Sequence, residues 1–311
     1  MAILKPIGIA AGGLLVLGLL LLGVWAWAPD RPRAILNEKY QRPSTRFLEV
    51  SGATLRVRDI GSKAAPVIVL LHGFGSSLET WESWATALAA DYRVVYFDFP
   101  GCGLSPPDPT GDYGDARTIE IVTTLLDRLG VDKAVFVGNS MGGRIAWKIA
   151  AERPSRVAKL VLISPDGFSS PGFEYGKQPQ VPRVLSLMKY FLPRSVLRAN
   201  LAVAYADPGR LSGSVLDRYY DLLRAAGNRD AMLARMKQTI LVDPAPLLRA
   251  ITAPTLVMWG EKDAMIPYRN SADYMRELSH GTLVSFADLG HVPHEELPDE
   301  SLVPLREFLL H

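Results

Sequence analysis

Apolar and polar positions along this chain alternate between the period of β-strands and that of α-helices. Eight short runs have the pattern of strands, at residues 47–50, 54–58, 67–71, 94–97, 133–137, 159–163, 255–259 and 282–286. The first two alternate like a half-exposed hairpin, whereas most later runs are continuously apolar. Helical spacing separates the later runs, at residues 79–90, 115–129, 140–153, 267–279 and 298–310. The pattern predicts an α/β fold, with a mostly parallel eight-stranded sheet and helices on both of its faces.

One interval breaks this alternation. No strand pattern appears at residues 164–254, between the runs at 159–163 and 255–259. This interval is far longer than a usual connection between a strand and a helix, which spans about 2–6 residues. We therefore expect a helical cap at residues 166–249. It would be inserted into a core formed by residues 46–165 and 250–311.

The first residues of the chain form an apolar block. No charged residue occurs between Lys5 and Asp30, and residues 7–28 are long enough as a helix to cross a hydrocarbon layer of about 30 Å. We expect residues 1–29 to form a single N-terminal transmembrane helix that anchors the protein in a membrane. Residues 30–45 would then be a linker.

Two alternatives to a retained anchor stay open. Ala26-Trp27-Ala28 has the form of a signal-peptidase site, although Pro29 directly after it would hinder the cut. A buried helix of a soluble domain is the other alternative. Basic residues after the segment favour a cytoplasmic domain by the positive-inside rule, whereas an N-terminal anchor of this layout more often exports the domain behind it, so the sequence does not choose a side.

Composition excludes several classes of protein. The chain has 311 residues, 48% of them hydrophobic, which allows a large buried core. Lys and Arg number 34 against 32 Asp and Glu, a net charge of +2, and no basic run contains aromatic residues, so nucleic acid is not an expected partner. The single cysteine, Cys102, rules out an internal disulfide and is expected to be a buried loop thiol. The oligomeric state cannot be inferred from these features.

A candidate nucleophile stands between the strand at 133–137 and the following helix. The turn reads Gly138-Asn139-Ser140-Met141-Gly142, and its glycines allow the strand and the helix to approach closely. Such an elbow holds Ser140 in a strained conformation that exposes its hydroxyl. The N–H of Met141, at the start of the helix, is free to stabilise an oxyanion. A glycine-rich turn with an incidental serine is the alternative.

A serine nucleophile needs a base, and the base needs an acid to orient it. Among five histidines, His291 follows the last strand at the carboxyl edge of the sheet and is our candidate base, with His294 as the local competitor. The strand at 255–259 leads into a turn that contains Glu261 and Asp263. Asp263 is preferred as the acid because it has more room to reach the imidazole, while Glu261 and Asp166 stay open.

The order serine, acid, histidine resembles the α/β-hydrolase superfamily, and further motifs over residues 46–311 support the resemblance. His72-Gly73-Phe74-Gly75 is similar to the family's oxyanion loop, which implies that the Phe74 N–H acts with that of Met141. Asp98-Phe99-Pro100-Gly101-Cys102-Gly103-Leu104-Ser105 is similar to a structural turn of the family. The acid turn and the histidine loop match as well, which implies a triad of Ser140, Asp263 and His291.

The resemblance implies a serine hydrolase that cleaves carboxylic esters through an acyl-enzyme, without metal or cofactor. The elbow sequence is similar to monoacylglycerol-lipase-like enzymes, some of them membrane-anchored. It is also similar to hydrolases that cleave carbon–carbon bonds in meta-cleavage products, which usually have tryptophan where this chain has Val292. The non-enzyme alternative is a membrane-tethered binding protein on the same fold.

The anchor and the cap together suggest apolar or lipid-derived esters as small-molecule substrates at a membrane, expected to be a bacterial inner membrane. Aromatic side chains are frequent in the cap. We expect Phe168, Tyr190 and Phe191, together with Val292 of the histidine loop, to line the substrate pocket. Ordinary packing of these side chains against the core is the alternative. Acyl length and head group depend on the depth of the pocket.

Overall fold

The computed structural model describes residues 16–18, 20–169 and 174–311, and its core is one eight-stranded sheet with the order β1-β2-β4-β3-β5-β6-β7-β8. The strands are β1 (Thr45–Val50), β2 (Ala53–Ile60), β3 (Val67–Leu71), β4 (Arg93–Phe97), β5 (Ala134–Asn139), β6 (Val157–Ile163), β7 (Thr255–Gly260) and β8 (Gly281–Phe286). Each corresponds to one predicted run, which confirms the predicted sheet.

The direction of the strands brings the loops that follow β3 to β8 to one edge of the sheet. β1 and β2 form an antiparallel hairpin, β2 pairs antiparallel with β4, and all other neighbours are parallel. The carboxyl ends of β3 to β8 therefore lie along the same edge of the sheet. Loops that are far apart in sequence meet there, which is where parallel α/β sheets place their ligands.

Helices cover both faces of the sheet. α4 (Asp115–Arg128), α5 (Met141–Glu152) and α10 (Asn270–Glu277) lie on one face, and α3 (Glu82–Leu88) and α12 (Pro298–Leu310) lie on the other. Side chains of a strand alternate between the two hydrophobic cores. Phe136 packs with the first group, while its neighbours Val135 and Val137 pack with the second. Burial on both faces explains why these strands are continuously apolar.

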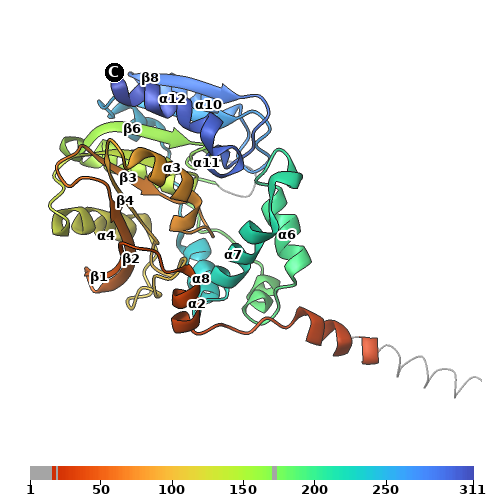
Figure 1. The fold of residues 1–311 in the computed structure, drawn as a ribbon. Helices are drawn as coiled ribbons and strands as arrows, with labels where there is room; N and C mark the ends of the chain where they lie inside the picture. The colour runs from red at the N-terminus through yellow and green to blue at the C-terminus, as the bar shows by residue number, and fades with distance from the viewer. Residues whose placement is uncertain (1–15, 19, 170–173) are drawn as a thin grey trace, which may run out of the picture.

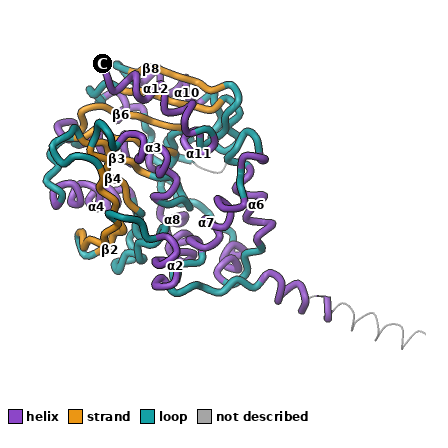
Figure 2. Tube along the Cα trace, viewed as in Figure 1, coloured by secondary structure: helices purple, strands orange, loops and turns teal. Residues whose placement is uncertain are grey.

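The interval between β6 and β7 contains helices and loops, and no strand among its described residues (Figure 2). Its elements are η3 (Arg183–Lys189), α6 (Arg194–Ala202), η4 (Pro208–Arg210), α7 (Gly213–Leu223), α8 (Asn228–Gln238) and α9 (Ala245–Arg249). In Figure 1, α6, α7 and α8 lie beside the end of the sheet. Leu248 of α9 packs in the same core cluster as Trp147, so this last helix belongs to the core by its contacts. The short elements η1 (Leu78–Trp81), η2 (Pro154–Arg156) and α11 (Pro293–Glu296) complete the fold.

Most of the predicted membrane span, residues 1–15 and residue 19, lies outside the described residues. Residues 16–18 and 20–26 are helical and project away from the body of the protein (Figure 1). In the part of the chain that the structure describes, no helix has both the length and the apolar character needed to cross a bilayer. The predicted transmembrane helix is therefore not supported by the fold.

The segment after it is closely attached to the cap. Trp27 forms a β-bridge with Phe191, with bonds from the Ala28 N–H to the Tyr190 carbonyl (2.8 Å) and from the Leu192 N–H to the Ala26 carbonyl (3.0 Å). The region that the sequence suggests as a linker contains α2 (Arg33–Tyr40). In α2, Leu36 is fully buried in a cluster with Leu104, Leu222 and Ala225, so this helix packs against both the core and the cap.

Candidate active site

Ser140 occupies the sharp turn between β5 and α5. Its backbone has φ 53° and ψ −120°, a region that residues other than glycine rarely adopt. A Cβ on Gly138 would lie 2.3 Å from the Gly142 carbonyl oxygen, and a Cβ on Gly142 would lie 2.1 Å from the Leu71 carbonyl oxygen. Both positions therefore require glycine. The turn leaves the Ser140 side chain partly accessible while its neighbours are buried.

The histidine loop after β8 and the acid turn after β7 meet beside this elbow. His291 Nδ1 lies 2.8 Å from Asp263 Oδ2, and both side chains are buried. The other carboxylate oxygen, Oδ1, accepts bonds from the N–H groups of Met265 (2.8 Å) and Ile266 (2.9 Å). These bonds hold the Asp263 carboxylate in a fixed orientation toward the imidazole.

The other acid candidates have different partners. Glu261 is exposed and accepts a bond from the Ser285 hydroxyl at 2.7 Å. Asp166 forms an ion pair with the buried Arg144. The structure thus brings Asp263, rather than Glu261 or Asp166, to His291.

His294 is enclosed on the other side of the histidine loop. Its ring stacks on Trp81 with centroids 4.1 Å apart and contacts the edge of Trp84. Its Nε2 lies 3.2 Å from the Thr80 hydroxyl. Burial lowers the pKa of His294 to about 3, so this histidine stays neutral. Its surroundings are those of a packed core residue, whereas His291 contacts a carboxylate.

Asn139 joins the serine elbow to the histidine loop, a role that the sequence analysis missed. Its buried side chain donates from Nδ2 to the carbonyl oxygens of His291 (3.0 Å) and Ile163 (3.1 Å). The residue next to Ser140 therefore fixes the backbone of His291. A polar amide at the end of an otherwise apolar buried strand is the signal that could have identified it.

The two residues nominated for an oxyanion hole, Met141 and Phe74, both belong to segments that border Ser140. Met141 is the first residue of α5, so its N–H has no acceptor within the helix. Phe74 belongs to the loop after β3, and this loop passes so close that a Cβ on Gly73 would lie 3.3 Å from the Ser140 Cβ. Phe74, Ser140 and Met141 line the same pocket.

His72 orders this loop from below. Its Nε2 accepts a bond from the Phe99 N–H (3.1 Å), and its Nδ1 lies 2.8 Å from the Gly73 carbonyl oxygen. Full burial lowers the pKa of His72 to about 4, so the ring is neutral. In the neighbouring turn, buried Asp98 accepts bonds from the Leu78 and Leu104 N–H groups at 2.7 and 2.8 Å. Both side chains support the loops beneath the elbow.

The pocket in front of Ser140 has a volume of about 450 Å³ and is mostly apolar. Besides Phe74, Ser140 and Met141, it is lined by Arg144, Asp166, Gly167, Phe168, Pro179, Gln180, Val181, Pro182, Met236, Thr239, Leu241, Met265, Ile266, Pro267 and Asn270. Phe168, which the sequence analysis nominated for a substrate pocket, is among the residues that line this cavity. Met236 and Leu241 add apolar lining from the cap.

The other three nominated pocket residues lie elsewhere. Tyr190 stacks on Trp27 with centroids 6.2 Å apart, and Phe191 contacts the edge of the same ring. Val292 is buried against Ala204 and Tyr205. Their placement in the pocket was wrong because these apolar side chains found partners in the N-terminal segment and in the cap.

Comparison with known proteins identifies the family to which the chain belongs. A family model described as alpha/beta hydrolase fold matches residues 66–298. The chain belongs to this α/β-hydrolase family. It is a hydrolase of that fold, as the order of its loops predicted.

Relatives of this α/β-hydrolase have diverse activities. The chain is 30% identical to a pimeloyl-[acyl-carrier protein] methyl ester esterase of Vibrio atlanticus, covering 75% of this chain and 90% of the relative. It is 29% identical to a 2-hydroxy-6-oxononadienedioate/2-hydroxy-6-oxononatrienedioate hydrolase of Dechloromonas aromatica, covering 83% and 91%. A solved structure described as a bacterial membrane phospholipase A matches with a TM-score of 0.71 and 25% identity, covering 98% of this chain and 96% of the other.

Proposed function

We propose that this α/β-hydrolase cleaves carboxylic esters of apolar substrates through an acyl-enzyme on Ser140. The observation that carries the proposal is the meeting of three loops at one edge of the sheet. Ser140 faces the pocket from its strained elbow, and the Asp263–His291 contact lies in the two adjoining loops. Asn139 bonds the serine elbow to the histidine loop.

In this mechanism, the His291 Nδ1–H donates a hydrogen bond to Asp263, which leaves Nε2 as the base for the Ser140 hydroxyl. Ser140 attacks the ester carbonyl, and the N–H groups of Met141 and Phe74 stabilise the oxyanion. His291 then gives the proton to the leaving alkoxide. A water molecule, activated by the same imidazole, cleaves the acyl-enzyme and releases the acid.

The substrate class follows from the lining of the pocket. Phe168, Met236 and Leu241 offer apolar surface, and burying each methylene of an acyl chain contributes about 0.8 kcal/mol. The ion pair between Arg144 and Asp166 at the wall neutralises its own charges. The pocket therefore favours an uncharged, apolar acyl group over a charged one.

Active-site labelling tests the proposal directly. The full chain should react with a fluorophosphonate probe and hydrolyse p-nitrophenyl esters, and Ser140→Ala should abolish both. Asp263→Asn should lower kcat by about 10⁴-fold because the imidazole loses the orienting carboxylate. Glu261→Gln, which changes an exposed carboxylate in the same turn, is the matched control and should retain activity. Labelling that persists in Ser140→Ala would refute the assignment.

We also propose that the N-terminal segment attaches the domain to a bilayer. Its described part exposes Leu20, Leu21, Leu22 and Trp25, which is unfavourable in water. Ala28 is fully buried in a cluster of cap residues, and cleavage after Ala28 would remove it from that cluster. This burial favours a retained segment over a cleaved signal peptide.

Vesicle flotation of the full chain tests this attachment. Binding should be lost when Leu20 and Leu21 are both changed to Asp, because each charge costs about 2.5–3.5 kcal/mol in a bilayer. Leu310→Asp, which changes an exposed leucine at the other terminus, should leave binding intact. Equal flotation of all three proteins would argue against an anchor.

A further inference from the structure

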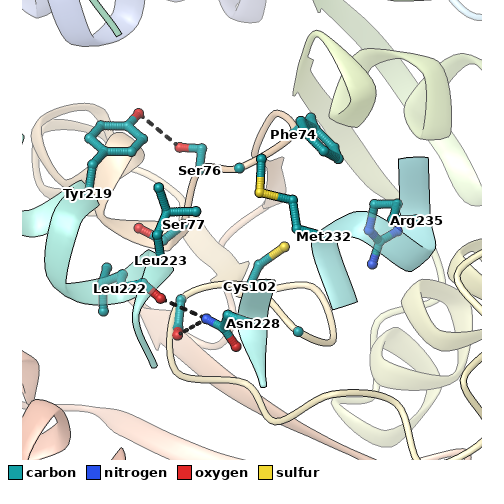
Figure 3. Close-up of a pocket in the computed structure, with 13 residues that line it drawn as sticks. Phe74, Ser76, Ser77, Cys102, Tyr219, Leu222, Leu223, Asn228, Met232 and Arg235 are labelled. Carbon is teal, nitrogen blue, oxygen red and sulfur yellow. Dashed lines mark hydrogen bonds between the residues drawn. The ribbon is translucent and has the colours of Figure 1, made fainter. Parts of the chain in front are cut away.

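A second, much smaller cavity lies behind the oxyanion loop. Its volume is about 20 Å³, compared with about 450 Å³ for the pocket in front of Ser140. Its lining comes from the loop that carries Phe74, from the turn that carries Cys102, and from α7 and α8 of the cap (Figure 3). A cavity of this size holds little more than one methyl group or water molecule.

The lining of this second cavity is apolar, because its polar side chains are already bonded. Asn228 donates to the carbonyl oxygens of Gly103 (2.9 Å) and Leu222 (2.8 Å). The hydroxyls of Tyr219 and Ser76 lie 3.2 Å apart. Arg235 donates away from the cavity, to the Pro100 carbonyl at 3.1 Å.

Cys102 adds to this apolar lining. Burial raises the pKa of its thiol to about 11, which keeps it neutral. A small neutral thiol behaves as an apolar side chain.

Phe74 separates the second cavity from the active-site pocket, and it is the one described residue that lines both. The two cavities also share α8. Met236 lines the pocket in front of Ser140, and Met232 lines the second cavity one helical turn away, a rise of about 6 Å. The two cavities therefore lie next to successive turns of the same helix.

The side chains of Phe74 and Met232, which lie between the two cavities, can both change conformation. Phe74 is 39% exposed, so the fold does not enclose this residue. Met232 lines the second cavity (Figure 3), and a methionine side chain adapts readily to new shapes. The Met232 methyl group packs near Gly75 of the loop that carries Phe74, since a Cβ on Gly75 would lie 3.8 Å from the methyl carbon, an ordinary van der Waals distance.

We propose that the second cavity receives the distal end of the substrate's acyl chain, and that Phe74 limits the length of chain that the enzyme accepts. The proposal rests on the ester hydrolysis proposed above. Its occupant is the saturated hydrocarbon tail of an ester whose carbonyl lies at Ser140. The argument for that occupant is that Phe74 and α8 line both cavities, and that the described lining of the second cavity has no free polar group.

The experiment compares p-nitrophenyl butanoate and dodecanoate as substrates of the full chain. In Phe74→Ala, the ratio of kcat/KM for dodecanoate to that for butanoate should rise about tenfold, as expected for two more buried methylene groups. Because the ratio is taken within one variant, a general loss from disturbing the oxyanion loop cancels. Phe74→Ala with Met232→Phe refills the space from α8 and should restore the wild-type ratio.

Tyr190→Ala is the matched control. It also removes an aromatic ring, but from a position outside both cavities, so the ratio should stay at its wild-type value. A folded Phe74→Ala protein with an unchanged ratio would overturn the proposal. So would a rise of the same size in Tyr190→Ala.

A binding measurement separates this proposal from the proposed function. Calorimetry measures the affinity of dodecanoic acid for two inactive proteins, Ser140→Ala and the double variant that also contains Phe74→Ala. The double variant should bind the acid about tenfold more tightly. Equal affinities would overturn the chain-length role of Phe74. Absence of ester hydrolysis by the wild-type chain would instead refute the proposed function, and the affinities would still decide whether the second cavity accepts an alkyl tail.

Discussion

Two of the regions in which the cap contacts the rest of the protein have opposite character. One is the histidine-loop contact, where residues 204–219 of the cap meet the loop that carries His291. The other is the pocket roof, residues 174–182 and 237–241, which covers the pocket in front of Ser140. The first is held by buried charges, whereas much of the second is exposed.

Glu296 is the centre of the histidine-loop contact. Its buried carboxylate accepts bonds from the N–H groups of Gly290 (2.8 Å), Ala206 (3.1 Å) and Asp207 (3.0 Å), and from the Arg210 guanidinium (3.2 Å). The His291 N–H in turn donates to the Ala204 carbonyl at 2.8 Å. The cap thus holds the His291 backbone through Ala204, and Glu296 joins the cap to the neighbouring Gly290.

Glu295 adds a second buried charge. Its carboxylate accepts bonds from Arg218 and from the hydroxyls of Tyr205 (both 2.7 Å), Tyr219 (3.2 Å) and Thr80. Burial alone would raise the pKa of Glu295, but the Arg218 charge and the hydroxyl bonds hold that pKa below its ordinary value. The group is therefore ionised at neutral pH.

The pocket roof is joined mainly to itself. The Gly176 N–H donates to the Leu241 carbonyl at 2.8 Å, and Gln178 donates to the Lys237 carbonyl at 3.1 Å in an exposed bond. Segments with few buried contacts open at low free-energy cost. The comparison indicates that the cap is held more firmly at the histidine-loop contact than at the pocket roof.

The largest effect is expected for Glu296→Ala. Loss of its carboxylate leaves three N–H groups and a guanidinium without their acceptor, so the free energy of unfolding should fall by about 3–5 kcal/mol. Urea unfolding measures the loss, and kcat should fall with it. Glu307→Ala, at an exposed helix position, is the control. A loss no greater than that of the control would remove the basis for a rigid contact.

Glu295→Gln should have a smaller effect. The amide oxygen still accepts hydrogen bonds, but Arg218 loses its charged partner, which costs about 1.5–3 kcal/mol. Urea unfolding at pH 7 measures the difference from wild type. An unchanged midpoint would mean that the ion pair contributes nothing net.

The pH dependence of that difference tests the charge itself. Because the folded-state pKa of Glu295 lies below its ordinary value of 4.5, its stabilisation is fully present above that pH and is lost as the pH falls through the folded pKa. The difference in the free energy of unfolding between wild type and Glu295→Gln should stay constant above pH 4.5 and become smaller below it. A difference that grows on acidification would contradict the assignment.

The smallest effect is expected at the pocket roof. Gln178→Ala removes one exposed hydrogen bond, so the free energy of unfolding should change by less than about 0.5 kcal/mol. Hydrogen exchange sharpens the contrast: the N–H groups of Ala206 and Asp207 should exchange far more slowly than that of Gly176. Comparable protection of the two regions would show that the cap moves as one body.

The patterning of the sequence accounts for the core of the fold. Buried parallel strands are continuously apolar, so all eight were recognised, and their carboxyl ends necessarily share an edge. That geometry also led to Asp263 and His291, whose contact depends on strand order and direction. The roles assigned to Ser140, Asp263 and His291 stay predictions that the labelling experiment tests.

The cap was less accessible to sequence reasoning. Glu295 and Glu296 read as ordinary charged residues, because nothing in the local pattern shows that Arg218 and the backbone of residues 206–207 will surround them. Tyr190 and Phe168 look alike in the sequence, yet one stacks on Trp27 and the other lines the pocket.

The sequence by itself determined the sheet, the helices that cover it, and the loops from which the candidate site is built, since these depend on short-range periodicity and on the geometry of parallel strands. Only the tertiary structure decided which cap side chains line the pocket, how Asn139 and Glu296 hold the histidine loop, and that Phe74 lines two cavities. These features depend on contacts between residues far apart in the chain, and such contacts leave no local pattern.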